Sequence, residues 1–225
     1  WNVSSYAINI ELYVPKNCTL DLKSVDGSIR VREVDGNHVL AAVDGSIEVR
    51  SVAGNVKCHS VDGSCRLIDV TGNVDVKTTD GSIELDGIDG DVVCRSVDGS
   101  CSLRQVRGAV EVSSTVGSVR VDGVLRDLSA SAEGGSVLVR AFEGSEAGQG
   151  WRISSVDGSV TLRIAPSLSA LLEARTDDGH VFVSVPVQFD VRSRHRTVAR
   201  IGDGSGSIRI STDDGSISIT ELEED

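Results

Sequence analysis

The sequence predicts an all-β protein whose chain winds as a parallel β-solenoid, or β-helix, with about 18 residues in each coil. Three observations support this prediction. Glycine recurs every nine residues from Gly27 to Gly117 without a slip, which is typical of a repeat architecture. Apolar residues recur two, four and seven positions after these glycines. The residues that follow the glycines alternate between two patterns, so the true period is 18 and each coil has two nine-residue halves.

Each nine-residue half predicts one strand and one turn. The apolar positions two and four after the glycine, such as Ile47 and Val49, follow the alternation of a β-strand. The apolar position seven after the glycine, such as Val52, indicates a bend that keeps the chain facing inward. An Asp-Gly pair then turns the corner, because glycine can adopt a positive φ and aspartate can bond the backbone two residues on.

A meander of antiparallel hairpins also fits a nine-residue period, but two features favour the solenoid. One set of glycines is followed by Ser and the other by Asn, Asp or Ala, so each coil contains one turn of each kind. The outward position three after the Ser-flanked glycines changes sign at 18-residue steps, as expected for side chains stacked on parallel strands about 4.8 Å apart. These residues are Arg30, Glu48, Arg66, Glu84, Ser102 and Arg120.

We expect a single domain over residues 1–225, with regular coils over about 19–144 and wider, irregular coils over about 145–225. The Ser-flanked glycines lose their strict spacing in the second part, where they fall at Gly158 and Gly215. Residues 192–207 read as a basic loop followed by a flexible glycine-serine turn. The charged ending ELEED is expected to keep the last open strand from stacking on a second molecule.

Composition limits both the core and the partners. Aromatic residues make up 3% of the chain and are absent between Tyr13 and Phe142, so the core of the regular coils must be thin and aliphatic. The net charge of −12 argues against nucleic acid or an anionic membrane as a partner, because both need a basic face. No apolar run is long enough to span a bilayer. Methionine is absent even at position 1, which suggests a mature or trimmed fragment.

An acidic column precedes the Ser-flanked glycines and is the candidate metal site. Stacked carboxylates could bind Ca²⁺, although calcium-binding nonapeptide repeats place aspartate after the glycines. Aspartate also forms turns without a metal, and we favour this interpretation, in which each carboxylate accepts a hydrogen bond from a backbone N–H or a Ser hydroxyl. A polar ligand-binding edge is the third option. The column contains Asp26, Asp44, Asp62, Asp80 and Asp98, and later Asp157, Asp178 and Asp214.

Four cysteines occur as two pairs within the regular coils. Cys58 and Cys65 lie seven residues apart, and Cys94 and Cys101 repeat this spacing two coils later. The other coils fill both positions with aliphatic residues, so we expect the members of each pair to face each other across the core. They are either disulfides, in an oxidising compartment, or buried thiols. Cys18 has no such partner, and no CxxC motif or nearby His pair indicates zinc.

No catalytic set emerges from the residue spacing. The four histidines are His38, His59, His180 and His195, and none has Ser and Asp at the spacing of a triad. A polysaccharide-acting β-helix enzyme would need long loops that carry carboxylates and aromatic residues over one face. Only residues 145–151 and 192–207 are expected to project. We therefore expect no enzymatic activity, no catalytic residue and no cofactor.

The alternating xVDGSIxV and VxGNVxV units, with RIGDGSGSIRISTDDGSISI near the end, resemble the bacterial adhesin-type β-solenoid family, a domain of unknown function. The resemblance covers nearly the whole chain and supplies no catalytic residue. It implies an extracytoplasmic protein of the cell envelope. We therefore expect a structural or adhesive binding module whose partner is a glycan or another envelope protein. The alternatives are a polysaccharide-acting enzyme and a self-associating filament subunit, which would need uncapped, apolar solenoid ends.

Overall fold

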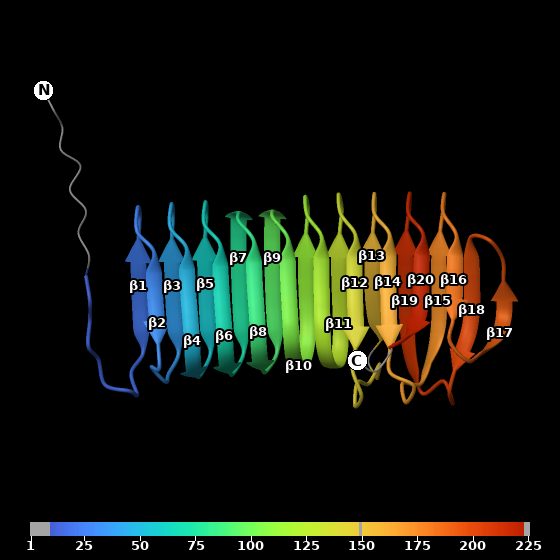
Figure 1. The fold of residues 1–225 in the computed structure, drawn as a ribbon, viewed down its shortest axis with the longest axis horizontal. Coiled ribbons are helices and arrows are strands. Elements are labelled where there is room, and N and C mark those ends of the chain that lie inside the picture. Colours follow the sequence, from blue (N-terminus) through green and yellow to red (C-terminus); the bar gives the residue numbers. More distant parts are fainter. Residues whose placement is uncertain (1–9, 149, 223–225) are drawn as a thin grey trace, which may run out of the picture.

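The computed structural model describes residues 10–148 and 150–222, which form twenty strands in one continuous β-solenoid (Figure 1). The strands lie side by side along the long axis of a slab, and the turns gather at its two edges. The all-β, mainly parallel architecture confirms the predicted fold class. Within the described residues no helix is long and apolar enough to cross a membrane.

One broad face, here called face A, is built from the strands that follow the Ser-flanked glycines. In spatial order these are β2 (Ile29–Arg32), β4 (Ile47–Ala53), β6 (Cys65–Thr71), β8 (Ile83–Asp89), the first parts of β10 (Cys101–Ser114) and β11 (Val119–Ala132), β12 (Val137–Ala141), β14 (Val160–Ile164), β20 (Ile217–Glu221) and β16 (Val181–Ser184).

The opposite face, face B, is built mainly from the strands that follow the other set of glycines. In spatial order these are β1 (Leu20–Ser24), β3 (His38–Ala42), β5 (Val56–Ser60), β7 (Val74–Asp80), β9 (Val92–Asp98), the second parts of β10 and β11, β13 (Trp151–Ser155), β19 (Gly206–Thr212), β15 (Ala170–Thr176), β18 (Arg196–Ile201) and β17 (Val187–Arg192). Strands β10 and β11 run without a break from face A to face B.

Parallel pairing of residues 18 apart defines the regular coils. Ile47 pairs with Cys65 on face A, and Val56 pairs with Val74 on face B. The same offset holds from Leu20, which pairs with His38, to Val119, which pairs with Val137, except that residues 106–108 pair with residues 17 further on. The registers exclude the antiparallel meander and confirm the 18-residue coil.

A left-handed residue produces the bend that the sequence predicts six to seven positions after the Ser-flanked glycines. Glu33, Ser51, Asp69 and Gln105 have φ values between 52° and 56°, and Gly87 occupies the same place with φ 69°. The chain turns at this residue while the next one, such as Val52, still points into the core. A short third side therefore joins face A to the turn that leads to face B.

The core is thin and almost purely aliphatic along the regular coils. Ile47, Leu67 and Val76 are fully buried, as are their equivalents in neighbouring coils. Among the described Phe, Tyr and Trp residues, one side chain is fully buried, and it lies where the repeat is interrupted. Trp151 is fully buried and its indole N–H donates to the Glu146 carbonyl at 3.0 Å, within the segment inserted before β13.

Side-chain ladders hold the two turns of each coil. At one edge, buried hydroxyls donate to glycine carbonyls, for example Ser60 to Gly45 at 3.1 Å and Ser114 to Gly99 at 2.8 Å. At the other edge, Asn side chains accept hydrogen bonds from the backbone of the next coil. The donors and acceptors are Asn55 to Asn37, Asn73 to Asn55, Asp91 to Asn73 and Ala109 to Asp91, at 3.0–3.2 Å. These ladders explain why the two halves of the repeat differ in sequence.

The C-terminal coils are stacked out of chain order. After β14, the chain passes over one coil position and forms the outer coil from β15 and β16. Strands β19 and β20 then return to fill the gap, so Ile208 pairs with both Trp151 and Leu172. On face A, Ile217 pairs with both Val160 and Val181. The expectation that the last strand is an open edge protected by ELEED is therefore wrong, because β20 is paired on both sides; residues 223–225 of that motif lie outside the described residues.

The two ends of the solenoid differ. At the C-terminal end, β18 pairs antiparallel with β15 and with β17, which closes face B with a hairpin (Figure 1). The Val181 amide also donates to the Arg194 carbonyl at 3.0 Å, so the loop before β18 covers the edge of β16. At the N-terminal end, β1 and β2 each pair with one strand among the described residues. The capped C-terminal end weighs against the filament alternative.

Candidate functional site

The acidic column lies exposed along the edge of the slab where the Ser-flanked glycines turn. Within the described residues, the carboxylates of Asp26, Asp44, Asp62, Asp80 and Asp98 make no hydrogen bond and no ion pair. The turn role that we assigned to them is instead filled by the buried Ser and Thr hydroxyls, so that part of the prediction is wrong. No group of three or more His, Cys, Asp or Glu side chains in the described part is arranged to hold a metal ion.

The four paired cysteines are free thiols buried inside the regular coils. Cys94 interacts electrostatically with Cys101 through the core, as Cys58 does with Cys65, and the Cys101 thiol donates a weak hydrogen bond to the Ser113 carbonyl at 3.8 Å. Burial raises the pKa of the Cys65 thiol to about 12 and the pKa of Cys58 and Cys94 well above the ordinary thiol value. The disulfides stay a prediction for an oxidising compartment. Cys18 is free and half-buried.

The histidines lie apart from any nucleophile. His38 is buried in the core, and its Nε2 lies 2.7 Å from the Val34 carbonyl, to which it donates. His180 stacks on Phe182 with ring centroids 5.8 Å apart. His59 and His195 are exposed. In the part of the chain that the structure describes, no histidine imidazole is hydrogen bonded to a Ser hydroxyl or a carboxylate; the His180 contact with the Ser216 hydroxyl, at 3.3 Å, is made by its backbone N–H.

Two outward columns of side chains run the length of face A, and they form the candidate binding site. The first column stands three positions after each Ser-flanked glycine and the second stands five positions after it. The first contains Arg30, Glu48, Arg66, Glu84, Ser102, Arg120, Leu138, Thr161, Ser218 and Phe182. The second contains Arg32, Arg50, Ile68, Asp86, Arg104, Asp122, Arg140, Arg163, Thr220 and Ser184.

Three of the four carboxylates in these columns are each shared by more than one arginine, whereas Asp86 forms no ion pair among the described residues. Glu48 forms ion pairs with Arg30 at 3.5 Å and Arg32 at 3.3 Å, and also with Arg50. Desolvation alone would raise the pKa of Glu48, but the charges of Arg50 and Arg32 outweigh it and hold the pKa below its usual value.

The same arrangement recurs further along face A. Glu84 forms ion pairs with Arg66 at 3.3 Å and Arg104 at 3.9 Å. Asp122, whose side chain is only 7% exposed, forms ion pairs with Arg120 at 2.8 Å and Arg140 at 4.0 Å. The sign alternation along the first column, predicted from Arg30, Glu48, Arg66 and Glu84, is therefore present as ion pairs between stacked coils.

Charge is segregated between the faces and the edges of the slab. The two columns of face A contain eight arginines and four carboxylates, so these columns carry a net charge of +4 although the whole chain has −12. The excess of negative charge lies at the edges, above all in the exposed acidic column. The net charge of the chain therefore conceals a basic face.

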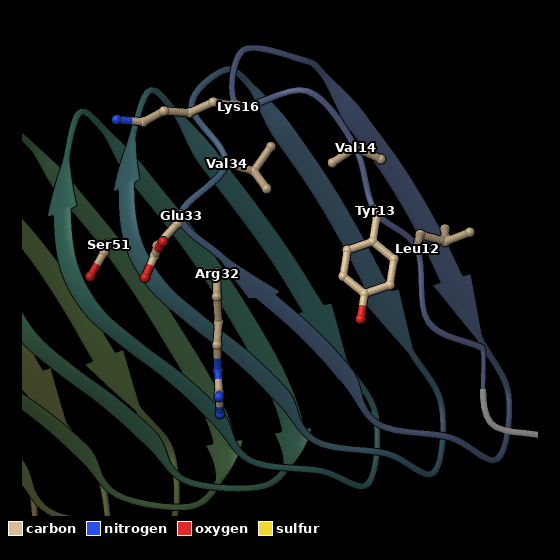
Figure 2. Close-up of a pocket in the computed structure, with 8 residues that line it drawn as sticks. All are labelled: Leu12, Tyr13, Val14, Lys16, Arg32, Glu33, Val34 and Ser51. Carbon is tan, nitrogen blue, oxygen red and sulfur yellow. The ribbon is translucent and has the colours of Figure 1, made fainter.

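Two surface hollows accompany these ladders. The larger, of about 600 Å³, lies at the N-terminal end between the segment carrying Leu12, Tyr13 and Val14 and the turn carrying Arg32 and Glu33 (Figure 2). It is lined by one carboxylate and two cationic side chains and contains no histidine or cysteine. The smaller hollow, of about 440 Å³, lies on the short third side, where Gly87 and Gly123 lack side chains and Phe142 forms one wall.

Sequence reasoning found the first column of face A but missed the second. The signal was present, because the position five after each Ser-flanked glycine reads Arg32, Arg50, Ile68, Asp86 and Arg104 at the same 18-residue steps. The place of Arg163 beside Thr220 could not be found this way, because the coil that contains Thr220 is inserted out of order.

Comparisons with known proteins identify the fold family but no relative of known activity. The sequence model of the Toastrack DUF4097 family matches residues 2–220. No curated protein and no solved structure matches the chain. The match supports a β-solenoid domain of unknown function, and it does not bear on adhesion, on the cell envelope or on a ligand.

Proposed function

Because the chain belongs to the Toastrack DUF4097 family, a domain of unknown function, we propose a function from its own geometry: a non-catalytic scaffold that binds an elongated ligand along face A. The observation that carries this proposal is the pair of outward columns on face A. They run uninterrupted over ten stacked strands, with the turns confined to the edges of the slab (Figure 1). A regular ladder of this kind offers the same contact at each step of about 4.8 Å.

A scaffold role is favoured over catalysis by how the polar groups are arranged. Three of the four carboxylates in the two columns, Glu48, Glu84 and Asp122, are paired with arginines of the same or neighbouring coils rather than gathered in a cleft. General acid–base chemistry on a glycan needs two carboxylates on either side of the scissile bond. Neither hollow lines up such a pair with a histidine or cysteine, since Glu33 is the one acidic residue that lines the first and Asp89 the one that lines the second.

The proposed place of action is the cell envelope, outside the cytoplasm, with a glycan or another envelope protein as the partner. This part of the proposal rests on the resemblance of the repeat units to envelope β-solenoids. The paired cysteines are compatible with it, because Cys94 and Cys101 are both buried and interact with each other in the core. Fractionation of cells that express the full-length protein tests the location, and recovery only from the cytosol would overturn it.

Binding to a size series of linear glycans, on an array and by calorimetry, tests the scaffold function. The ten strands of face A span roughly 45 Å at the strand spacing of a parallel sheet. We expect affinity to rise with oligomer length until the ligand covers the face, and no new reducing ends to form. Length-independent binding, absence of binding across the series, or release of reducing ends would each contradict the proposal.

A further inference from the structure

Face A is an arginine-rich surface on an acidic protein, and its charge is arranged in a narrow strip. The strip consists of the two outward columns, which hold Arg30, Arg66, Arg104, Arg120 and Arg163 among their eight arginines. The exposed acidic column runs parallel to it along one edge of the slab. A ligand that fits this pattern must carry negative charge along a line and must be narrow enough to avoid the edge.

We propose that face A binds a linear anionic polysaccharide that lies along the solenoid axis and carries a carboxylate or phosphate on its repeating unit. This inference rests on the proposed scaffold function and names the class of its ligand. Each arginine offers five N–H donors in a planar fork that matches a carboxylate or a phosphate.

The arginines are available to such a ligand. The side chains of Arg30 and Arg66 are 65% and 51% exposed, although each forms an ion pair. Exposed ion pairs contribute little to stability and exchange readily with other anions. Glu48 is shared by three arginines and Glu84 by two, so guanidinium donors are left over. Arg163 is exposed and has no ion pair among the described residues.

Other polyanions fit face A less well. A flat anionic membrane or a nucleic-acid duplex is wider than two side-chain columns and would approach the acidic edge, where like charges repel. Single-stranded nucleic acid binds by stacking its bases on aromatic side chains. The two columns contain one aromatic residue, Phe182, at the C-terminal end of the face. A chain of acidic sugars needs neither a wide surface nor stacking, which makes it the favoured ligand.

The test compares two triple variants of the whole chain that remove equal charge from opposite faces. The face A variant is Arg66→Gln, Arg104→Gln and Arg163→Gln. The control is Lys57→Gln, Lys77→Gln and Arg95→Gln on face B, where Lys57 and Arg95 also form exposed ion pairs. The probes are alginate for carboxylates, a polyol-phosphate polymer for phosphates, and neutral dextran, with anionic vesicles and single-stranded DNA as competing partners. Each is titrated at low and at physiological salt.

We expect the chain to bind one of the anionic polymers and not dextran, with affinity that falls as salt rises. The face A variant should bind at least tenfold more weakly, and the control less than twofold more weakly. Arg163→Gln alone should weaken binding measurably without changing the melting temperature, because it breaks no ion pair. The arm that binds, alginate or polyol phosphate, identifies the anionic group.

Several results would overturn the inference and separate it from the scaffold proposal. Equal loss in both triple variants would show non-specific attraction rather than a site on face A. Binding of dextran as tightly as alginate would leave the scaffold function standing and remove the anionic ligand. Tighter binding to anionic vesicles or to single-stranded DNA would assign face A to another partner. Absence of binding to every glycan would remove both proposals.

Discussion

At the scale of single residues, close approach of stacked backbones explains most of the glycine repeat. The Ser-flanked glycines do not have positive φ values, contrary to the expectation that Asp-Gly turns need them. A Cβ at Gly63 would instead lie 2.3 Å from the Gly45 carbonyl oxygen of the preceding coil. The glycines that are not followed by Ser are required for both reasons, positive φ and close approach. Gly54, for example, has φ 139°, and a Cβ there would lie 2.1 Å from the Gly36 carbonyl oxygen. From Gly36 to Gly117, each glycine of the nine-residue repeat is therefore required by the coil beneath it.

Gly63→Ala should destabilise the protein severely. The new methyl group meets backbone rather than a movable side chain, so two coils must separate, at a cost of about 3 kcal/mol or more. Urea unfolding measures the change. Gly148→Ala is the control, because a Cβ there has no heavy atom within 4 Å, and it should change stability by less than about 0.5 kcal/mol. Equal stability of the two variants would contradict the stacked-glycine explanation.

A second prediction at the scale of single residues concerns the residue with positive φ at the bend of each coil. Ser51 is exposed and has φ 54°, a conformation that β-branched residues strongly disfavour. Ser51→Val should lower the free energy of unfolding by about 1–2 kcal/mol. Ser102→Val, at an outward position within strand β10, should be neutral or slightly stabilising, because valine favours strands. A thermal or chemical unfolding series that ranks the two variants in the opposite order would disprove the role of the bend.

At the scale of elements, the C-terminal hairpin replaces the missing next coil. Strand β18 supplies the hydrogen bonds that the outer edge of β15 would otherwise leave open, and unpaired edges promote aggregation. Thr197 is buried in β18 and is paired with both Ala174 and Arg192. The hairpin is therefore expected both to stabilise the fold and to keep the edge of β15 from pairing with a second molecule.

Thr197→Pro should release the hairpin. Proline removes a backbone donor from a strand that is paired on both sides, which costs about 3 kcal/mol in regular structure. We expect higher oligomers in size-exclusion chromatography with light scattering. Thr197→Val keeps the backbone N–H and should remain as monodisperse as the parent chain. A monodisperse Thr197→Pro variant would show that the edge of β15 needs no cap.

The buried thiol pairs are a second property of the elements, since facing strands of one coil bring them together. Only the thiolate attacks an alkylating reagent. With the pKa of Cys65 raised to about 12, almost no thiolate forms at pH 8 in the folded protein. The other three paired cysteines are as deeply buried as Cys65, which keeps the reagent away from them. Iodoacetamide at pH 8 should modify Cys18 but not the four buried cysteines, as read by mass spectrometry.

Unfolding before alkylation provides the control for that experiment. Chain purified with reductant should then react at all five cysteines. Chain purified from an oxidising compartment without reductant should leave Cys94 and Cys101 unmodified and should lack two hydrogens for each bond. Reaction of Cys94 with iodoacetamide in the folded chain would contradict the buried position of the pair.

At the scale of the whole molecule, the charge pattern separates a basic face from an acidic edge. Stacked carboxylates without a counter-charge repel one another, and added salt screens this repulsion. We expect the melting temperature to rise by a few degrees with sodium chloride. Asp62→Asn combined with Asp80→Asn should give the same rise at low salt, because it removes two adjacent charges from the column.

Calcium distinguishes screening from a metal site on the same column. If the carboxylates only repel, millimolar Ca²⁺ and Mg²⁺ should raise the melting temperature equally. A ligand that binds the native state stabilises it by mass action, so a much larger rise with Ca²⁺ would identify a calcium site at Asp26, Asp44, Asp62, Asp80 and Asp98. Differential scanning fluorimetry of the parent chain and the double Asn variant decides between these outcomes.

Sequence alone determined the regular part of this protein, because every coil makes the same contacts with the next coil. The glycines, the inward Val and Ile positions and the alternating signs at Arg30, Glu48 and Arg66 are set by contacts between residues 18 apart, so the period is written in the chain. The pairing of Cys94 with Cys101 followed from the same register.

Only the tertiary structure decided the order of the last coils, the cap and the composition of face A. Strand β20 fits between β14 and β16 because each presents an open parallel edge, and edges are satisfied through backbone hydrogen bonds that carry no sequence signature. The exposed Asp column likewise gave no sign that Ser and Thr hydroxyls hold its turns. Local patterns specify which side chains each strand buries. Which strand pairs with an open edge depends on the arrangement of all the coils together.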